Sequence, residues 1–498
     1  MKTIFERGKP GRRAFVCPPT DVPERSLDEL IPARLRRREP PRLPEVSEPE
    51  LVRHYVNVSK RNYDLDSGFY PLGSCTMKHN PRLHERVAAL PGNARLHPLQ
   101  DPARAQGALE LMFNLQEALG EIAGLPHVSL QPSAGSHGEL AGLLLARAYH
   151  EDRGERRAKV LTPDTAHGTN PATVTMAGFE VVKVGTAPDG GVDLDDLRAK
   201  ADEGVACLML TNPNTLGLFD SNIEQIAAVV RGVGATLYYD GANLNAVMGI
   251  TRPGDMGFDI VHFNLHKTFT QPHGGGGPGA GPIACGDRIE PYLLTPRVVR
   301  TEHGFELDDD RPKSIGRLRG FQGNYGTFVR AYAYIRSLGA EGLNDVSVSA
   351  VLNANYLKAR LAEVSDKLPI AYDRVCAHEF CLSGGPMSKQ LGVRTLDLAK
   401  RLLDHGFHPP TIYFPLLVDE ALLIEPTETE TKETLDAFAD AIAAILSEAA
   451  EDPEIARTAP HAVPVRRLDE ASAAKRPVIR QRLEVTGTAS VAEPRASG

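Results

Sequence analysis

The chain lacks the features that would assign it to a membrane-spanning, secreted or zinc-binding class of proteins. No apolar run in its 498 residues approaches the length that spans a membrane, and the N-terminal sequence MKTIFERGKPGRR has no apolar core of a secretory signal. Its six cysteines show no C-x-x-C spacing, which is typical of reduced thiols and not of a disulfide framework or a zinc site. We therefore expect a cytoplasmic protein.

An excess of positive charge is also missing. The formal net charge is −8 at pH 7, which argues against general binding to nucleic acid or to an anionic membrane surface. Hydrophobic residues make up 42% of the chain and charged residues 24%, and these shares are ordinary for a globular protein. The length is sufficient for two or more domains with a large buried core.

No internal repeat is visible, but the composition changes along the chain. Residues 1–60 are rich in Arg, Pro and Glu and are predicted to form an N-terminal arm with one or two short helices. Such an arm either wraps a neighbouring subunit or is a solvated leader. A large domain is predicted over 61–330, a smaller α+β domain over 331–450 and a tail over 451–498, whose end from about 480 is predicted to be disordered.

Strand-like and helix-like segments alternate in the large domain. Apolar runs predict strands at 128–130, 159–161, 179–184, 205–210, 236–240 and 259–263, and apolar residues at helical spacing predict helices at 109–119, 139–149 and 223–230. Further helices are predicted at 328–337 and, as the last helix of the smaller domain, at 433–446. This alternation indicates an α/β fold with a mostly parallel sheet and helices on both of its faces.

The most informative segment is 259–281, with the sequence DIVHFNLHKTFTQPHGGGGPGAG. Its strand-like beginning, Asp259 to Phe263, is followed by Lys267, which is held at a strand end beside His266. A fixed and partly desolvated amine loses its proton more readily, so Lys267 suits a Schiff base. The four glycines Gly274 to Gly277 have no Cβ atom, so backbone or ligand can approach them closely.

The segment after the strand at 128–130 has the composition of an anion site. Ligands of open parallel sheets bind beyond the carboxyl ends of the strands. Here the sequence LQPSAGSHGE places Ser133, Ala134, Gly135 and Ser136 before a helix that is predicted to start near Glu139. Free N–H groups and the helix dipole make this segment a cradle for an anion, best for a phosphate. An ordinary capped helix start is the alternative.

Three further strand ends carry polar residues. His167 follows 159–161, where it can stack on a cofactor ring, although a hydrogen-bonded turn is equally compatible with it. Thr211 follows 205–210 directly. Asp240 ends 236–240 before small residues that include Ala242, and its carboxylate can keep a ring nitrogen protonated. A helix N-cap and a magnesium ligand are the alternatives for Asp240.

These parts are the ones that pyridoxal 5′-phosphate requires: a phosphate cradle, a ring cover, an acid for the pyridine nitrogen and a lysine for the aldehyde. The glycine run is no P-loop, since no Gly-Lys-Ser/Thr follows it, and Pro278 and Pro282 oppose the helix start of a dinucleotide site. No cysteine or carboxylate completes a metal cluster with His262, His266 and His273, so no metal is expected.

Several long strings resemble the P-protein family of the glycine cleavage system, the decarboxylating glycine dehydrogenases. They are YPLGSCTMKHNP (70–81), LQPSAGSHGE, DTAHGTNPATVTMAGFEVV, YYDGANLNAVMG, HFNLHKTFTQPHGGGGPGAGPI, SIGRLRGFQGN (314–324), HPPTIYFPLLVDEALLIEPTETETKETLD (408–436) and PVRRLDE (464–470). The resemblance covers about 50 to 470. It implies the aspartate-aminotransferase-like fold of pyridoxal-phosphate enzymes (fold type I), with a mainly parallel, seven-stranded sheet in the large domain.

The resemblance also implies a partner and residue roles. A chain of this length that carries the lysine corresponds to subunit 2 of the split two-subunit form, which pairs in a heterotetramer with a homologous subunit 1 without the lysine. Related decarboxylases place a ring-stacking histidine, a threonine, an aspartate, an alanine and a His-Lys pair in this order, which here are His167, Thr211, Asp240, Ala242, His266 and Lys267. The implied catalytic residues are Lys267, Asp240 and His167.

The implied activity is the decarboxylation of glycine, with release of carbon dioxide and transfer of the aminomethyl group to the lipoyl arm of the H-protein. A stand-alone amino-acid decarboxylase would need the same site but no lipoyl protein, and a non-enzymatic scaffold would need neither the lysine nor the aspartate. Cys75 is interpreted as a buried thiol and not as a nucleophile. A place near the site and a place in a structured surface loop are equally compatible with the polar residues Thr76, Lys78, His79 and Asn80.

Overall fold

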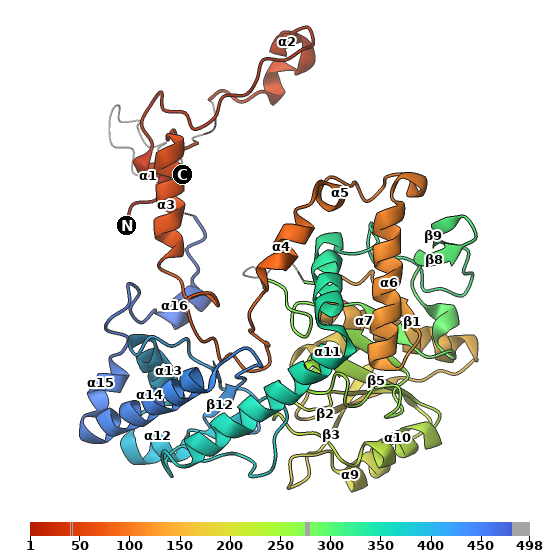
Figure 1. Cartoon of the computed structure of the whole chain (residues 1–498), viewed down its shortest axis with the longest axis vertical. Coiled ribbons are helices and arrows are strands. Elements are labelled where there is room, and N and C mark those ends of the chain that lie inside the picture. The colour runs from red at the N-terminus through yellow and green to blue at the C-terminus, as the bar shows by residue number, and fades with distance from the viewer. Residues whose placement is uncertain (40, 42, 274–278, 481–498) are drawn as a thin grey trace, which may run out of the picture. The chain divides into compact units, whose positions relative to one another are not determined.

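The computed structural model describes residues 1–39, 41, 43–273 and 279–480 (Figure 1). The chain forms two compact units, one of residues 1–63 and 463–498 and one of residues 64–462. The glycine run at 274–277 and the end of the predicted tail beyond 480 lie outside the described residues. The division into arm, large domain, small domain and tail stays a prediction.

The first unit contains short helices. They are α1 (Ile4–Arg7), α2 (Leu27–Leu30), the 3-10 helix η1 (Ala33–Leu35), α3 (Glu48–Ser59) and α16 (Glu470–Lys475). The helix α3 begins at a capping box, in which the N–H of Ser47 donates to the Glu50 carboxylate at 3.0 Å. The segment before residue 60 therefore holds more helix than the one or two short helices that its composition predicted.

The second unit is built on a seven-stranded sheet with the order β1-β7-β6-β5-β4-β2-β3. The strands are β1 (His127–Ser129), β2 (Lys159–Pro163), β3 (Glu180–Val184), β4 (Val205–Leu210), β5 (Thr236–Gly241), β6 (Ile260–Phe263) and β7 (Ile283–Cys285). The pairs β3–β2, β2–β4, β4–β5 and β5–β6 are parallel, and β7 runs antiparallel to both of its neighbours. The predicted, mostly parallel sheet is confirmed.

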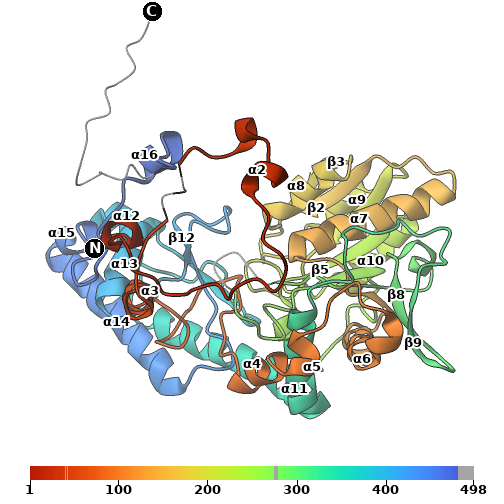
Figure 2. The ribbon, with the colours of Figure 1, turned by 90° about the horizontal axis from the view of Figure 1, so that it is seen from above.

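Helices cover both faces of this sheet. All residues of β4, β5 and β6 are buried, as expected for strands with helices on two sides. Side chains alternate between the faces: Leu237 and Tyr239 belong to the core formed with α6 (Gln106–Ala123) and α10 (Ile223–Gly232), whereas Tyr238 belongs to the core formed with α7 (Gly135–Asp152). Figure 2 shows α7 and α10 together with the strands β2, β3 and β5.

Glycines on α7 let this helix lie very close to the sheet. A Cβ atom on Gly142 would be 2.3 Å from Cε2 of Tyr238, and one on Gly138 would be 2.8 Å from Cβ of His262. Such distances are too short for any real Cβ contact, so only glycine fits here without a shift of the neighbours. The close approach brings the start of α7 next to the carboxyl ends of β5 and β6.

A three-stranded antiparallel sheet forms a second core in the same unit. Its order is β10 (Phe380–Ser383), β12 (Ala421–Ile424), β11 (Thr411–Ile412), and it packs with α12 (Gly385–Leu391), α13 (Thr395–Asp404), α14 (Lys432–Glu451) and α15 (Pro453–Arg457). The helix α11 (Tyr325–Ala362) contributes to both cores and is interrupted at Gly339, with φ 66° and ψ −175°. The helix predicted at 328–337 therefore continues for 25 residues beyond Ser337, because the chain resumes a helix after this interruption.

The remaining elements of the second unit are short. They are α4 (Arg82–Ala88), α5 (Pro91–Ala94), η2 (Pro102–Arg104), α8 (Thr169–Met176), α9 (Leu194–Lys200), η3 (Leu244–Ala246), η4 (Glu290–Tyr292) and the hairpin of β8 (Arg297–Thr301) and β9 (Gly304–Asp308). Among the residues that the structure describes, no helix combines the length and the hydropathy that a bilayer crossing needs.

Candidate active site

A pocket of about 260 Å³ lies at the carboxyl ends of the parallel strands. This is the edge at which open parallel sheets bind their ligands. Nine of the ten residues predicted to bind a cofactor line it: Ala134, Gly135, Ser136, His167, Thr211, Asp240, Ala242, His266 and Lys267. The structure therefore brings together residues that are up to 133 positions apart, Ala134 and Lys267, although their individual roles stay predictions.

Asp240 is held at the end of β5 as a buried carboxylate. Its oxygens accept hydrogen bonds of 3.0 Å from the side-chain amide of Asn170 and of 3.0 Å from the N–H of Ala242. Burial by itself would raise the pKa of Asp240, but His262, Asn170, Ala242 and Lys267 outweigh burial, so the pKa lies below its ordinary value. An acid of this kind remains ionised at neutral pH, as a partner for a protonated ring nitrogen must.

His262 supports Asp240 from the neighbouring strand. Its Nε2 atom lies 3.5 Å from Oδ1 of Asp240 and 2.9 Å from the amide nitrogen of Asn264, and its Nδ1 atom is hydrogen-bonded to the hydroxyl of Tyr238. Sequence reasoning considered His262 only as a metal ligand. Its place on β6, directly beside a strand-end acid, is the signal by which it could have been found.

The N-terminus of α7 points its free N–H groups at the pocket. The helix starts at Gly135, four residues before the predicted start near Glu139, and its N-cap residue Ala134 supplies no side-chain cap. The first N–H groups of a helix have no intrahelical partner and attract anions. A Cβ atom on Gly135 would lie 2.3 Å from Oδ1 of Asn264, so this position requires glycine.

Ser133 is turned away from the pocket. Its backbone N and its Oγ atom lie 3.2 and 3.1 Å from Nδ1 of His137, and its carbonyl accepts a hydrogen bond of 3.3 Å from the side chain of Asn324. Ser133 is the one predicted cradle residue that does not line the pocket. Because the helix starts early, the predicted cradle residues that line the pocket are Ala134, Gly135 and Ser136.

Lys267 reaches the pocket from the turn after β6. Its backbone N–H donates to the carbonyl of Asn264 at 3.0 Å, and its half-buried side chain lines the pocket. No hydrogen bond or ion pair occupies its amine within the described residues. The neighbouring His266 is neutral, because burial first, and then the charges of Lys267 and His273, lower its pKa to about 3.

His167 lies at the mouth of the pocket. Its side chain is exposed, its Nδ1 atom lies 2.9 Å from Oγ1 of Thr169, and its ring centroid is 5.7 Å from that of Phe414. Thr169 in turn donates to the buried carboxylate of Glu139 at 2.8 Å. An aromatic side chain held at this place can cover a ring that enters the pocket.

Seven lining residues were not predicted: Ser74, Glu139, Thr169, Thr215, Asn243, His262 and Asn264. Four of them, Thr215, Asn243, His262 and Asn264, lie in a predicted strand or within five positions of its end, so the same reasoning, applied to more positions, would have included them. Glu139 and Thr169 lie nine and eight positions beyond a predicted strand end. Ser74 comes from a different part of the chain, and no local pattern indicates it. The glycines Gly274 to Gly277, which were predicted to allow close approach, lie outside the described residues.

The segment 73–81 lies beside the pocket, which Ser74 lines, and it is partly buried, with His79 exposed. Thr76 and Lys78 are each 2% exposed, and the hydroxyl of Thr270 donates to the carbonyl of His79 and to Oδ1 of Asn80, both at 2.8 Å. Of the two interpretations left open by the sequence, the burial of Thr76 and Lys78 supports a place near the site for these two residues. Burial raises the pKa of Cys75 to about 11, which argues against a nucleophilic role for this thiol.

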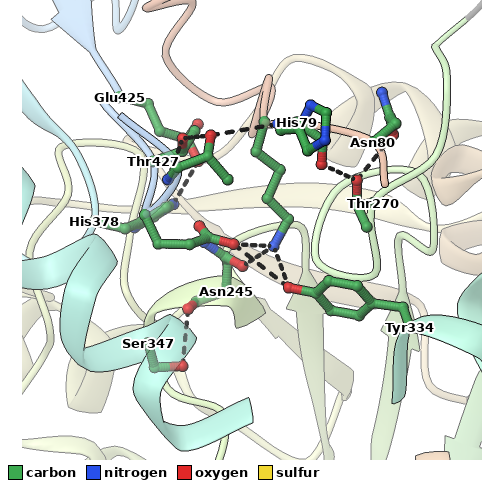
Figure 3. A network of polar contacts seen from close by, with 12 residues as sticks. His79, Asn80, Asn245, Thr270, Tyr334, Ser347, His378, Glu425 and Thr427 are labelled. Carbon is green, nitrogen blue, oxygen red and sulfur yellow. Dashed lines mark hydrogen bonds and ion pairs between the residues drawn. The ribbon is translucent and has the colours of Figure 1, made fainter. Parts of the chain in front are cut away.

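Lys78 is the anchor of this segment. Its ammonium group donates to Oδ1 of Asn245 at 2.7 Å, to Oε1 of Glu428 at 2.7 Å and to the hydroxyl of Tyr334 at 3.2 Å (Figure 3). Burial opposes the charge on Lys78, but Glu428 and Tyr334 outweigh it and raise the pKa of Lys78 above its ordinary value. The network joins segment 73–81 to η3, to α11 and to the segment after β12.

Comparisons with protein families and relatives agree along the chain. The family model for the glycine cleavage system P-protein matches residues 22–299, and the model for the glycine dehydrogenase C-terminal domain matches residues 346–462. A protein of Halalkalibacterium halodurans named "Probable glycine dehydrogenase (decarboxylating) subunit 2" is 59% identical over 478 residues, which are 96% of this chain and 97% of that protein. A protein of the same name from Bacillus licheniformis is 56% identical over 96% of this chain and 98% of its own length.

Solved structures show the same fold. A glycine decarboxylase (P-protein) of the glycine cleavage system, in inhibitor-bound form, superposes with a TM-score of 0.73 at 24% identity, over 84% of this chain and 95% of that chain. A cysteine desulfurase from Thermococcus onnurineus superposes with a TM-score of 0.60 at 16% identity, over 77% of this chain and 95% of its own. These structures confirm the predicted aspartate-aminotransferase-like fold.

Proposed function

The chain belongs to the P-protein family of the glycine cleavage system, and from this we propose how its residues carry out the pyridoxal-phosphate-dependent decarboxylation of glycine. The observation that carries the proposal is the shared pocket of Asp240 and Lys267. The two groups are close enough for the charge of Lys267 to contribute to the low pKa of Asp240. A lysine and an ionised aspartate at one strand-end pocket are what this cofactor needs on two sides of its ring.

The N–H groups and side chains that line the pocket match the parts of pyridoxal phosphate. The uncapped N-terminus of α7 offers N–H groups and the positive end of a helix dipole to a phosphate. Asp240 would hold the proton on the pyridine nitrogen through a charge-assisted hydrogen bond worth about 1.5–3 kcal/mol. The amine of Lys267 would hold the aldehyde, and His167 would cover the ring. Thr211, Ala242 and His266 line the remaining wall.

The chemistry follows from this arrangement. When bound, the cofactor supplies the sink for the electron pair that remains as carbon dioxide leaves. Asp240 would keep the ring nitrogen of the cofactor protonated and the sink therefore effective. The amine of Lys267 lies inside the pocket, where it would hold the aldehyde of the cofactor and, once released from it, would accept or donate a proton.

The partners are the finer part of the proposal. The relatives that this chain matches over almost their whole length are named as subunit 2, which indicates a split enzyme with two kinds of subunit. We propose that this chain assembles into a heterotetramer with the homologous subunit 1, which lacks the lysine. The aminomethyl group would pass to the lipoyl arm of the H-protein. All six cysteines are free, which supports a cytoplasmic location.

The test is a comparison of Lys267→Ala with the unaltered chain, both purified with subunit 1. We expect the unaltered protein to gain a visible absorbance with pyridoxal phosphate and to release labelled carbon dioxide from glycine when lipoylated H-protein is added. Lys267→Ala should lose both properties. Lys389→Ala, which alters an exposed lysine on α12, is the matched control and should retain both.

Two outcomes would overturn the proposal. A protein that stays colourless and indifferent to the coenzyme would have no such site. Full release of carbon dioxide without H-protein and without subunit 1 would identify a stand-alone amino-acid decarboxylase instead.

A further inference from the structure

Two glutamates face each other behind the pocket. Glu379 precedes β10 and Glu425 follows β12, and the antiparallel register pairs Phe380 with Ile424, so the two glutamates are the next opposed pair. Both side chains are fully buried. One carboxylate oxygen of each lies within 4.8 Å of the other and of a ring nitrogen of His378. Like charges that face each other across two strands destabilise a sheet, so this pair needs an explanation.

The segment 73–81 donates its backbone to both carboxyl groups. The N–H of Ser74 donates to Oε2 of Glu379 at 2.7 Å, and the N–H groups of Cys75 and Thr76 donate to Oε2 of Glu425 at 3.2 and 2.8 Å. Ser74 and Thr76 take the left-handed conformation, with φ 65° and 51°, which is costly for residues other than glycine. The backbone is thus held in a strained shape that aims three donors at this pair.

The opposite side of the pair has groups without partners. Oε1 of Glu425 and both ring nitrogens of His378 have no hydrogen-bond partner among the described residues. His378 is fully buried, and its Nε2 lies 3.8 Å from Oε1 of Glu425 (Figure 3). A buried polar group without a partner destabilises the folded protein. The free oxygen and the free ring nitrogens therefore face a place where a proton or a small cation belongs.

The burial of the pair and the mutual repulsion of its two carboxyl groups favour a proton at this place. Burial first, and then the charge of Glu425, raise the pKa of Glu379 well above its ordinary value, and burial likewise raises that of Glu425. Burial lowers the pKa of His378 to about 3, so its ring is neutral. Among the described residues, the ionisable groups that face the pair are Cys75, Lys78, Lys267, His273, Cys376, His378, Cys381 and Glu428. Among the residues that the structure describes, the one cation that acts on both carboxyl groups is Lys267, since Lys78 is neutralised by Glu428.

We propose that Glu379 and Glu425 share one proton in the resting protein, and that this proton passes through the amine of Lys267 to the sulfur atom released when the lipoyl disulfide opens. The second part rests on the proposed function. Ser74 and Asn243 line the pocket and both donate to Glu379, so the pair lies one residue layer behind the pocket. The two glutamates act through Lys267 and are positioning residues.

The proton balance of the reaction requires such a donor. Carbon dioxide leaves glycine, the remaining carbon forms a bond to one lipoyl sulfur, and the sulfur–sulfur bond breaks with its electron pair on the second sulfur. The carbon is oxidised by two electrons and the disulfide is reduced by two. The second sulfur then needs one proton to become a thiol. Lys267 gives this proton and is recharged by the carboxyl pair, which regains a proton from solvent.

Infrared spectroscopy of the complex with subunit 1 tests the shared proton without cofactor or turnover. A protonated carboxyl group has a C=O stretch that is separate from the bands of carboxylates. We expect such a band at neutral pH, shifted by isotope-labelled glutamate, altered in Glu379→Gln and in Glu425→Gln, and lost when both are replaced. Glu454→Gln, an exposed glutamate on α15, should leave the band unchanged.

Three infrared or analytical results would overturn the shared proton. They are the absence of the band from the unaltered protein, an unchanged band in the double variant, and a metal ion at one equivalent per chain that is lost in Glu425→Gln. If the double variant does not fold, the isotope shift in the unaltered protein and the change of the band in either single variant still show whether the pair holds a proton.

Kinetics test the transfer step separately. A lost proton donor lowers a rate by about 10²–10⁴-fold. We expect Glu425→Gln to lower aminomethyl transfer to the lipoyl arm by at least about a hundredfold, while cofactor absorbance and its change on glycine binding remain. An equal loss of aminomethyl transfer, of cofactor absorbance and of the absorbance change on glycine binding would indicate a merely structural role. If the unaltered protein transfers nothing, the proposed function fails, but the infrared result still stands.

Discussion

Asp240 and His262 are opposed residues in the parallel register of β5 and β6, with Nε2 of His262 3.5 Å from Oδ1 of Asp240. The strand pairing therefore places the ring beside the carboxylate, without any contribution from a flexible loop. Gly138 leaves the space that His262 occupies, because a side chain there would collide with it. The acid at the base of the pocket is thus positioned by the sheet and by the helix packed on it.

Replacement of Asp240 by Asn removes the charge that we propose to hold the ring nitrogen protonated. A charge-assisted hydrogen bond of about 1.5–3 kcal/mol corresponds to about a tenfold to hundredfold loss of cofactor affinity. Titration of the apoprotein with pyridoxal phosphate, followed by absorbance, measures this change. Asp255→Asn, which alters an exposed ion pair with Arg252, is the control and should bind as the unaltered protein does. Equal affinity in all three proteins would contradict the role of Asp240.

Gly142→Ala should destabilise the protein by about 1–3 kcal/mol, because the added methyl group would lie 2.3 Å from the ring of the buried Tyr238. Gly107 is also helical, but a Cβ atom there meets nothing within 4 Å. Gly107→Ala should therefore stabilise the protein slightly, by up to about 1 kcal/mol, because alanine favours helix. Chemical denaturation measures both. If the two variants shift stability in the same direction, the close approach of α7 to the sheet is not as described.

Lys78→Met should be strongly destabilising. It removes the ammonium group from a buried pair and leaves Glu428 without its partner, which costs about 3–5 kcal/mol. The double variant Lys78→Met, Glu428→Gln should recover part of this loss, since the uncompensated charge is then gone. Lys432→Met breaks an exposed pair with Asp436 on α14 and should cost less than about 1 kcal/mol. A Lys78→Met variant as stable as Lys432→Met would rule out a buried ion pair at this place.

Acid should destabilise the protein through its buried neutral histidines. Burial lowers the pKa of His378 and of His266 to about 3, below the ordinary value of 6.5, so the folded protein binds fewer protons than the unfolded chain between these values. The contribution of these histidines to the free energy of unfolding is fully present above pH 6.5. It falls as the pH decreases, by up to about 1.4 kcal/mol per pH unit for each histidine. Denaturation at several pH values measures how the free energy of unfolding depends on pH. His378→Asn should weaken this dependence, and His303→Asn, in an exposed turn, should not.

For the buried pair of Glu379 and Glu425 we expect the opposite dependence of stability on pH. A raised pKa means that folded Glu379 and Glu425 bind a proton more tightly than the unfolded chain does, so stability is lost as the pH rises above the ordinary value of 4.5. Denaturation at several pH values above neutrality should show a smaller loss in Glu425→Gln than in the unaltered protein. A slope identical to that of Glu454→Gln would argue against the raised pKa.

The sequence predicted the parts of the fold that depend on local pattern. Six of the seven strands of the large sheet were found, because each is an apolar run between turns, and the seventh, Ile283–Cys285, was missed because it has three residues directly after the glycine-rich segment. Asp240 and Lys267 were predicted from strand ends, since the parallel topology brings successive strand ends to one edge. The start of α7 was placed too late because no capping side chain marks it.

The environment behind the pocket was not accessible to local reasoning. Ser74 is 305 residues from Glu379, and Cys75 is 350 residues from Glu425, yet each pair is hydrogen-bonded. No periodicity relates such distant positions. Only the folded register of β10 and β12 brings the two glutamates together, and only the left-handed turn at Ser74 and Thr76 directs the donors toward them.

The bonds of Lys78 have a mechanical consequence. One nitrogen atom is hydrogen-bonded both to Asn245, which follows β5 of the large sheet, and to Glu428, which follows β12 of the small one. Any hinge rotation of one sheet against the other must stretch at least one of these bonds. It would also move the backbone of segment 73–81, which faces Glu379 and Glu425. The two bonds of this nitrogen atom thus limit how far the protein can open around its substrate.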